Sequence, residues 1–585
     1  MKDLIKQYKV NLILLLGVLL SSLPLVFPGI EGHFGQDLGF HLNRIEGIYI
    51  ELKNGVFPVR MQSFWMEGYG YPVSIYYGDI FLYFPALLRL FGMPVVAAYK
   101  LFLLSVNIFT VWVAYICFGK ILGGSESYKE VPGIGGDDLR MVAAIGALVY
   151  ATANYRLLNL YIRAAVGEYT AMLFLPVVAL AVYEIYYRDP EDPDYPRAVA
   201  PLVIGMSGIL ESHMMTLEMV CILLAVICLL NLKKTFRPAT LRVWITGAAL
   251  TLLLNLSFIL PFLDYFLTEN VRINNVVQNA RQIQESGAYI WEYFAFFMIP
   301  FSNLEPGITS DRMSVTPGVI LIAVCFVGAF LFVTKKTDAP MKKLLVGSGI
   351  LLLVSSHFFP WNYLSAHTRV GNFLAQVQFP WRYIGIASLL LTLLLLLLLR
   401  QIKAPGRRIA FCLILGTSLF MCLWFARVYH KYAEFDHFAK TEDLDTYDMG
   451  FIEYLRPDAV REEFTHRIEV VSGDAEVGET FRQGTAADYE VSARTDAVVE
   501  LPILHYKYYA LRDDEGRVYE LKDGANDVIA FKVPAGFRGD LHLRYEEPLL
   551  WHVAEVVSLF TFLALCTLCL QKRKEWTKTK AGSAA

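Results

Sequence analysis

Long apolar runs alternate with short polar stretches along the whole chain. About twelve of these runs approach the roughly 20 residues that a helix needs to cross a bilayer. They lie near residues 10–28, 95–119, 141–156, 168–187, 199–213, 215–231, 243–266, 317–334, 343–359, 383–399, 408–427 and 549–570. A segment inside lipid must satisfy its own backbone hydrogen bonds, so the pattern predicts a polytopic α-helical membrane protein with about twelve transmembrane helices. The stretch at 199–231 could be two short helices or one long broken one.

The lysines and arginines between the runs predict how the helices are oriented. Basic clusters fall in every second loop, and such clusters mark the cytoplasmic side of a membrane. They are Lys233, Lys234, Arg237 and Arg242; Lys335, Lys336, Lys342 and Lys343; Arg400, Lys403, Arg407 and Arg408; and Lys572, Arg573 and Lys574. We therefore expect a multi-pass protein of the cell (plasma) membrane. Both termini should be cytoplasmic, with 571–585 as a basic tail.

The loops on the opposite side are long, and they cover about 29–94, 267–316, 360–382 and 428–548. In the last of them charge rises and short alternating segments appear, with a tight-turn signal at 513–516. Strands are expected at 465–471, 488–494, 497–501, 506–511 and 540–544. The pattern predicts a small extracytoplasmic β-sandwich before the last span at 549–570.

This sandwich completes the predicted organisation of the chain. Residues 1–427 form the transmembrane domain, with 29–94 as its large first outer loop. The outer domain could serve as a docking cap, which we favour, or as a carbohydrate-binding module, because a sandwich fold does not itself specify a function.

Composition narrows the class of protein. Hydrophobic residues make up 55% of the chain and charged residues 18%, whereas soluble proteins carry about 25% charged residues. The net charge of −3 argues against a nucleic-acid partner. The eight cysteines all lie in apolar runs, so no disulfide framework is expected. No phosphate-binding glycine loop, H-E-x-x-H or dinucleotide fingerprint occurs, which argues against a nucleotide-driven cytoplasmic engine.

Five polar clusters fall at the predicted outer face, where polar groups near lipid are costly and therefore predict function. The first holds Asp37 and His41, which share one face if the segment is helical. A carboxylate beside an imidazole can act as a base or hold a metal. A helix-capping aspartate near a surface histidine is the structural alternative. The second cluster, at 67–79, is rich in Gly, Pro and Tyr, and its aromatic faces suit sugar rings or the membrane interface.

The other three clusters carry arginine or histidine. Arg163 could grip a phosphate and Glu168 could bind a metal or a hydroxyl, or the two could form a structural ion pair. His213, with Glu211 beside it and Glu218 further on, lies at the turn of a short helical hairpin, where it could be structural or functional.

Gln378 and Arg382 precede a span on the side opposite the basic loops. The positive-inside rule disfavours an arginine there, which favours an anionic partner such as a lipid phosphate; a snorkelling side chain is the alternative.

The order and sidedness of these clusters resemble the GT-C superfamily of integral membrane glycosyltransferases. The chain looks most like bacterial YfhO-like membrane proteins and their relatives, which are often labelled 6-pyruvoyl-tetrahydropterin synthase-related. The resemblance rests on residues 37–41, 68–72, 163–168, 212–213, 378–382 and 501–509. The pterin label carries no weight as a function, because the chain shows neither the zinc-binding histidine cluster nor the soluble core of a pterin enzyme.

The resemblance implies a glycosyltransferase that moves a sugar from a polyprenyl-phosphate-linked donor to an extracytoplasmic acceptor, an envelope glycan or polymer. Asp37 matches the family's acidic position in the first outer loop. The resemblance therefore implies that Asp37 acts as a general base or orients a metal or the acceptor. Many members carry a paired-acid motif there, whereas Leu38 and Gly39 follow Asp37 in this chain. The need for a divalent metal such as Mg²⁺ or Mn²⁺ therefore stays open.

The expected site follows from these assignments. Asp37 and His41 are the catalytic candidates. The residues expected to bind substrate or phosphate are Arg163, Glu168, His213, Gln378 and Arg382, and those that could hold a metal are Asp37, Glu168 and His213. The alternatives are a transporter or flippase for lipid-linked glycans, or a non-catalytic assembly factor. A transporter would need inverted repeats and broken helices, and no convincing internal repeat is present.

Overall fold

The computed structural model describes residues 2–27, 29, 32–123, 136–273, 280–297, 315–433, 436–437 and 452–582. Parts of two predicted outer loops, at 298–314 and 438–451, lie outside this description, as do the side chains of the basic tail. The chain divides into two compact units. The first holds residues 1–46, 80–244 and 275–449, and the second holds residues 47–79, 245–274 and 450–585.

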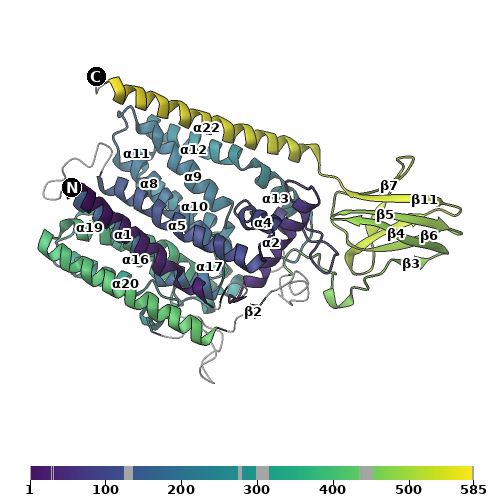
Figure 1. Ribbon diagram of the computed structural model, residues 1–585, viewed down its shortest axis with the longest axis horizontal. Coiled ribbons are helices and arrows are strands. Elements are labelled where there is room, and N and C mark those ends of the chain that lie inside the picture. The colour runs from purple at the N-terminus through teal and green to yellow at the C-terminus, as the bar shows by residue number, and fades with distance from the viewer. Residues whose placement is uncertain are drawn as a thin grey trace. The chain divides into compact units, whose positions relative to one another are not determined.

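The first unit is a bundle of helices (Figure 1). Its longer helices are α1 (Lys2–Ser22), α5 (Val95–Gly123), α6 (Gly136–Ala151), α8 (Val166–Tyr187), α9 (Val199–Leu210), α10 (Met214–Leu230), α15 (Val319–Val333), α16 (Ala339–Val354), α19 (Tyr383–Gln401) and α20 (Ala404–Tyr432). Shorter pieces are η1 (Leu23–Val26), α4 (Tyr83–Leu90), α7 (Asn154–Leu157), η2 (Leu158–Ile162), η3 (Tyr195–Ala198), α11 (Leu232–Thr235), η4 (Ala280–Ser286), η5 (Ile290–Phe294), α17 (Trp361–His367), α18 (Arg369–Leu374), η6 (Ala375–Val377) and η7 (Pro380–Arg382). The strands β1 (Gly32–His33) and β2 (Asp436–His437) pair antiparallel. Helices α2 (Leu38–Lys53) and α12 (Pro238–Leu254) contribute residues to both units.

The protein is a multi-pass membrane protein. Among the described residues, six helices are long and apolar enough to cross a bilayer, and two bent helix pairs raise this number to eight. One pair joins Asp138–Ala151 to Asn154–Ile162 at 45°, and the other joins Pro238–Leu254 to Leu256–Thr268 at 74°. Every one of the predicted spans coincides with a helix or a bent pair, and 199–231 forms two helices, α9 and α10. The count of about twelve crossings stays a prediction.

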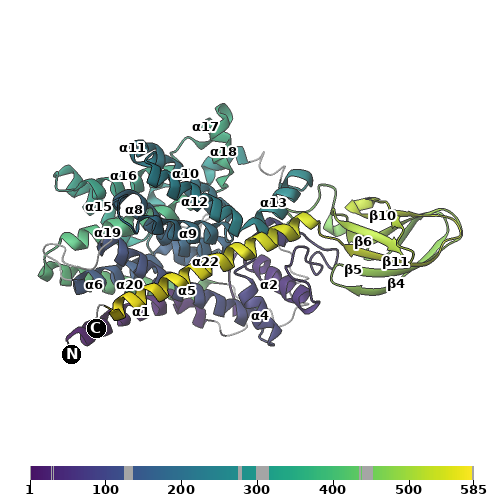
Figure 2. The same ribbon diagram turned by 90° about the horizontal axis from the view of Figure 1, so that it is seen from above.

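The second unit contains a β-sandwich, whose two sheets are seen together in Figure 2. One sheet has the order β3-β6-β10-β9 and the other β4-β5-β11-β7-β8. The strands are β3 (Glu469–Ser472), β4 (Ala475–Gln483), β5 (Ala486–Ala493), β6 (Ala497–Leu504), β7 (Tyr509–Asp513), β8 (Val518–Tyr519), β9 (Leu521–Asp523), β10 (Val528–Val533) and β11 (Arg538–Tyr545). Both sheets bury side chains in one core, among them Tyr489, Leu501 and Phe531. The predicted antiparallel domain is confirmed, and its five expected strands overlap β3, β5, β6, β7 and β11.

The other elements of this unit are α3 (Val73–Tyr76), α13 (Leu256–Thr268), η8 (Arg461–Glu463), η9 (Ala525–Asp527) and α22 (Leu549–Gly582). The aromatic loop at 67–79 packs inside the unit. Tyr69 stacks on Phe464 at 4.0 Å, and Tyr76 stacks on Tyr454 at 4.6 Å. Both tyrosines are buried. They therefore offer no open face to a sugar or to lipid, and their role is to bind this loop to the segment before the sandwich.

Candidate functional site

Three segments that lie far apart in the sequence meet in the first unit and form the candidate site. The backbone N–H groups of Gln36 and Asp37 donate to the carbonyls of Ile162 and Arg163 at 3.0 and 2.8 Å. This approach requires glycine at position 35, because a Cβ there would overlap the Cβ of Ala164. Backbone contacts therefore hold Asp37 beside Arg163.

The segment that carries Arg163 has an unusual backbone. Residues Leu158–Ile162 form a π-helical turn, and the N–H of Arg163 donates to the carbonyl of Leu158 at 3.0 Å. Ala164 then adopts the left-handed conformation, with φ +53°, before α8 begins at Val166. Both π-helical turns and left-handed residues other than glycine are rare, and both occur frequently at functional sites.

Glu168 is the centre of the charged cluster. Its Oε2 lies 2.6 Å from Arg163 Nη1 and 3.4 Å from Arg382 Nε. Its Oε1 accepts hydrogen bonds from the hydroxyl of Tyr155 and from Asn159 Nδ2. All three charged side chains are buried. The structural ion pair that the sequence left open is therefore present, with a second arginine added to it, and such pairing is what makes buried charge tolerable.

Arg382 is held in place by the turn that precedes it, at residues 377–378. Its Nη1 donates to the carbonyl of Val377 at 2.8 Å and to Gln378 Oε1 at 3.1 Å. Gln378 is itself left-handed, with φ +64°. The structure therefore brings Arg163, Glu168, Gln378 and Arg382 together.

Asp37 differs from Glu168 in having an uncommitted carboxylate. Its side chain is half-buried, and within the described part of the chain the carboxylate takes part in no hydrogen bond or ion pair. Burial raises its pKa above the ordinary value and so does Glu168, while Arg163 and Arg382 act in the opposite direction. A raised pKa makes a carboxylate a better proton acceptor, which is what a general base requires.

The two candidate histidines are buried and make local contacts. The N–H of His41 donates to the carbonyl of Asp37 at 3.2 Å, and its Nδ1 lies 3.3 Å from Arg44 Nη1. His213 caps α10, where its Nδ1 accepts from the N–H of Thr216 at 3.2 Å. Burial and Arg44 lower the pKa of His41, so its imidazole is neutral and weakly basic.

The three residues expected to hold a metal do not provide a fitting donor set. Both carboxylate oxygens of Glu168 are engaged by the arginines, Tyr155 and Asn159, and His213 Nδ1 is engaged by its cap. Only Asp37 has uncommitted oxygens, and two guanidinium groups lie near it. A divalent cation in this position would face two positive charges.

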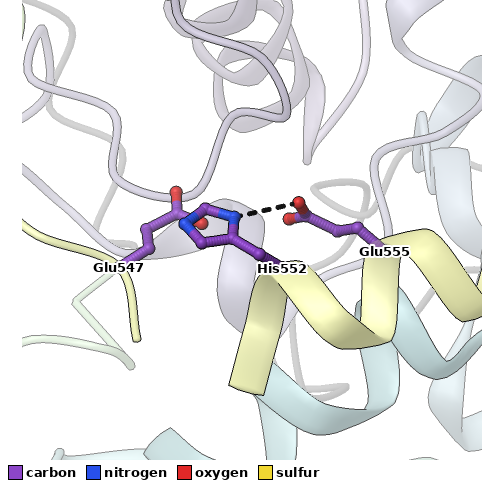
Figure 3. A group of neighbouring side chains, drawn as sticks. All are labelled: Glu547, His552 and Glu555. Carbon is purple, nitrogen blue, oxygen red and sulfur yellow. Dashed lines mark hydrogen bonds and ion pairs between the residues drawn. The ribbon is translucent and has the colours of Figure 1, made fainter. Parts of the chain in front are cut away.

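One other cluster in the described residues has metal-like geometry. The donor atoms of Glu547, His552 and Glu555, in the second unit, lie within 4.8 Å of one another (Figure 3). However, Arg60 Nη2 lies 2.8 Å from Glu555, and Arg60 Nε lies 4.0 Å from Glu547. The guanidinium thus supplies the positive charge that a metal would bring.

Four aromatic and amide side chains of the site had no role assigned from the sequence, although Phe379 and Trp381 lie in the segment 378–382 that carries the resemblance. Tyr155 and Asn159 bind Glu168, and Trp381 and Phe379 lie against the arginines, with 4.5 Å from Arg163 Cζ to the centroid of Trp381. A signal for the first two was available, because residues 155, 159 and 163 are four apart and form a polar stripe in an apolar run.

No family model matches this chain, and no curated protein does. Among solved structures, the arabinofuranosyltransferase AftD from Mycobacteria matches 72% of this chain at 13% identity and TM-score 0.36; this chain spans 27% of that enzyme. A mutant of AftD matches at 15% identity and TM-score 0.34, with 72% of this chain and 28% of that one covered. The archaeal oligosaccharyltransferase AglB from Archaeoglobus fulgidus, in complex with an inhibitory peptide and a dolichol-phosphate, matches 73% of this chain and 56% of its own at 12% identity and TM-score 0.40.

The chain spans about a quarter of AftD and about half of AglB. At TM-scores this low the superpositions give no residue-by-residue correspondence, so the site is interpreted from its own geometry.

Proposed function

We propose that this protein is a membrane glycosyltransferase that moves a sugar from a polyprenyl-phosphate-linked donor to a cell-envelope acceptor outside the cytoplasm. The observation that supports it most is the uncommitted carboxylate of Asp37, held by the backbone beside Arg163 and near Arg382. Such an arrangement suits a transfer reaction, in which the carboxylate accepts a proton from the acceptor and the two arginines bind the phosphate that leaves the donor.

In the proposed reaction, a hydroxyl of the acceptor attacks the anomeric carbon of the donor sugar. The new glycosidic C–O bond forms as the C–O bond to the phosphate breaks, and the hydroxyl proton passes to Asp37. The bond electrons leave with the polyprenyl phosphate, whose negative charge Arg163 and Arg382 stabilise. Glu168 keeps both arginines in place, and the buried setting strengthens their interaction with the phosphate.

The finer topology belongs to the same proposal. We place all of the predicted spans across the plasma membrane, with both termini in the cytoplasm and Asp37 at the outer face, in keeping with the YfhO-like resemblance. A polyprenyl tail would then enter sideways between helices from the lipid.

The proposal includes no resident metal, because Glu168 and His213 are committed to other partners. Removal of divalent ions with a chelator should leave transfer unchanged.

A complementation experiment tests the function. The gene is deleted, then restored as wild type, Asp37→Asn or Asp540→Asn, and surface glycans and polyprenyl-phosphate sugars are profiled by mass spectrometry. Asp540 is an exposed strand residue and serves as the matched control. We expect deletion to remove one glycan modification and to raise its lipid-linked donor, and Asp37→Asn, present at normal level, to restore neither. Full restoration by Asp37→Asn would make Asp37 structural and would favour a flippase or an assembly factor.

A further inference from the structure

Four side chains beside Glu168 form a continuous stack, in which two aromatic rings lie between two guanidinium groups. The guanidinium of Arg163 lies 4.5 Å from the centroid of Trp381, and that of Arg382 lies 5.0 Å from the centroid of Phe379. The two rings are stacked on each other, with centroids 4.9 Å apart and planes 14° apart. Each arginine of the site therefore has an aromatic partner, and the two partners touch.

The ring of Trp381 is unavailable as a sugar platform. Trp381 is 7% exposed, so its ring is covered by protein. Cation–π contact of this kind is stronger where water is excluded than at an exposed surface. The contact also restricts a long flexible side chain to one orientation, in which the N–H groups of the planar guanidinium are directed in its own plane.

The backbone of this segment fixes the stack from one short turn. Phe379, Trp381 and Arg382 follow one another across η7, directly after the left-handed residue Gln378. The side chain of Gln378 accepts from Arg382 Nη1 at 3.1 Å and so completes the turn. A left-handed glutamine costs of order 1 kcal/mol and persists only where its surroundings require it.

We propose that Trp381 is a positioning residue for Arg163 and that Phe379 has the same role for Arg382, so that both guanidinium groups present their N–H edges to the phosphate of the lipid-linked donor. The inference rests on the proposed function, and it concerns residues that do not themselves touch the reacting atoms. Removal of the Trp381 ring should therefore weaken phosphate binding while leaving the lipid tail's contribution intact.

The test uses the purified full chain and two probes, undecaprenyl phosphate and the uncharged alcohol undecaprenol. Affinity for each is measured from ligand-dependent thermal stabilisation. The variants are Trp381→Leu, Trp381→Phe and the matched control Trp112→Leu, whose ring lies exposed on α5. We expect Trp381→Leu to lose about tenfold in affinity for the phosphate and almost nothing for the alcohol, and Trp381→Phe to stay within about threefold of wild type. Trp112→Leu should bind both probes as wild type does.

A double-mutant cycle separates positioning from general damage to the fold. Trp381→Leu is repeated in an Arg163→Gln background, which lacks the guanidinium that the Trp381 ring is proposed to orient. We expect no further loss of phosphate affinity there. An equal tenfold loss in both backgrounds, or an equal loss for the alcohol, would overturn the positioning role. If wild type itself does not distinguish the phosphate from the alcohol, the proposed function fails instead.

Discussion

Two of the carboxylate clusters described above differ in charge balance. In the first unit one glutamate, Glu168, lies between two buried arginines. In the second unit two glutamates, Glu547 and Glu555, share the single guanidinium of Arg60. With Asp37 nearby, the two arginines of the first cluster balance two carboxylates, whereas in the second cluster one arginine faces two. Geometry alone would have made the second the better metal site, whereas charge balance makes the first the better anion site.

The clusters also differ in how they are assembled. Glu547, His552 and Glu555 come from nine consecutive residues at the start of α22, so one helix turn brings most of the cluster together. The Glu168 cluster needs segments from three distant parts of the chain, and two of them contain a left-handed residue other than glycine. A site that is maintained against strain in this way is better explained by function than by stability.

The largest expected effect is the difference in stability between a variant that neutralises Glu168 and one that neutralises Glu547. Glu168→Gln removes the carboxylate that pairs directly with two buried arginines, and we expect it to destabilise the protein by about 3–5 kcal/mol. Glu547→Gln removes the extra carboxylate from a partly exposed cluster and should change stability by less than about 1 kcal/mol. Thermal unfolding of both purified variants in the same detergent measures the contrast. Equal shifts would show that the charge balance does not distinguish the clusters.

The second prediction concerns assembly from distant segments. Gly35→Ala places a methyl group against Ala164 and pushes Asp37 away from the arginines. A displacement of about 1 Å at a catalytic group can cost about 100-fold in rate, so we expect a loss of that size in sugar transfer. Transfer is measured in membranes that contain equal amounts of each variant. Gly416→Ala, where an added methyl group meets nothing, is the control. Normal transfer by Gly35→Ala would mean that the close backbone contact does not position Asp37.

The smallest effect is the pH dependence of the second cluster. Burial raises the pKa of Glu547 and so does Glu555, while Arg60 opposes them. A carboxyl whose folded pKa is raised binds more protons in the folded state, so its contribution to stability is present below the ordinary pKa of 4.5 and is lost as pH rises through the folded value. The melting temperature of wild type relative to Glu547→Gln should therefore rise slightly as the solution is acidified from about pH 7 to about pH 5. A flat or falling difference would contradict the raised pKa.

Much of the site could be predicted from sequence because charge in an apolar chain is conspicuous. Asp37, Arg163, Glu168 and Arg382 were identified by the cost of placing them near lipid, and the structure brings them together. Which of these four residues pair with one another could not be predicted. The sequence allows Glu168 to bind a metal, and only the contacts of its two oxygens show that it binds arginines instead.

The sandwich shows the same division. Strands with alternating burial, such as β5 and β6, were expected from their pattern. Strand β4 was missed because nearly all of its side chains are exposed, and β10 because its first four are all buried, so neither alternates. The tyrosines at 69 and 76 were assigned to a surface because their number suggested open faces. Their burial depends on partners some 380 residues away, which no local pattern reports.

The separation of the site's segments along the chain has a consequence for biosynthesis. Asp37 emerges from the ribosome more than 300 residues before Arg382. At about 5–20 residues per second, the delay is roughly tens of seconds. During this time Glu168 has only one arginine, and the turn at Gln378 does not yet exist. The Glu168 cluster is therefore completed late in synthesis, and a ribosome that stalls before residue 382 would leave a membrane-inserted chain without the second arginine of this cluster.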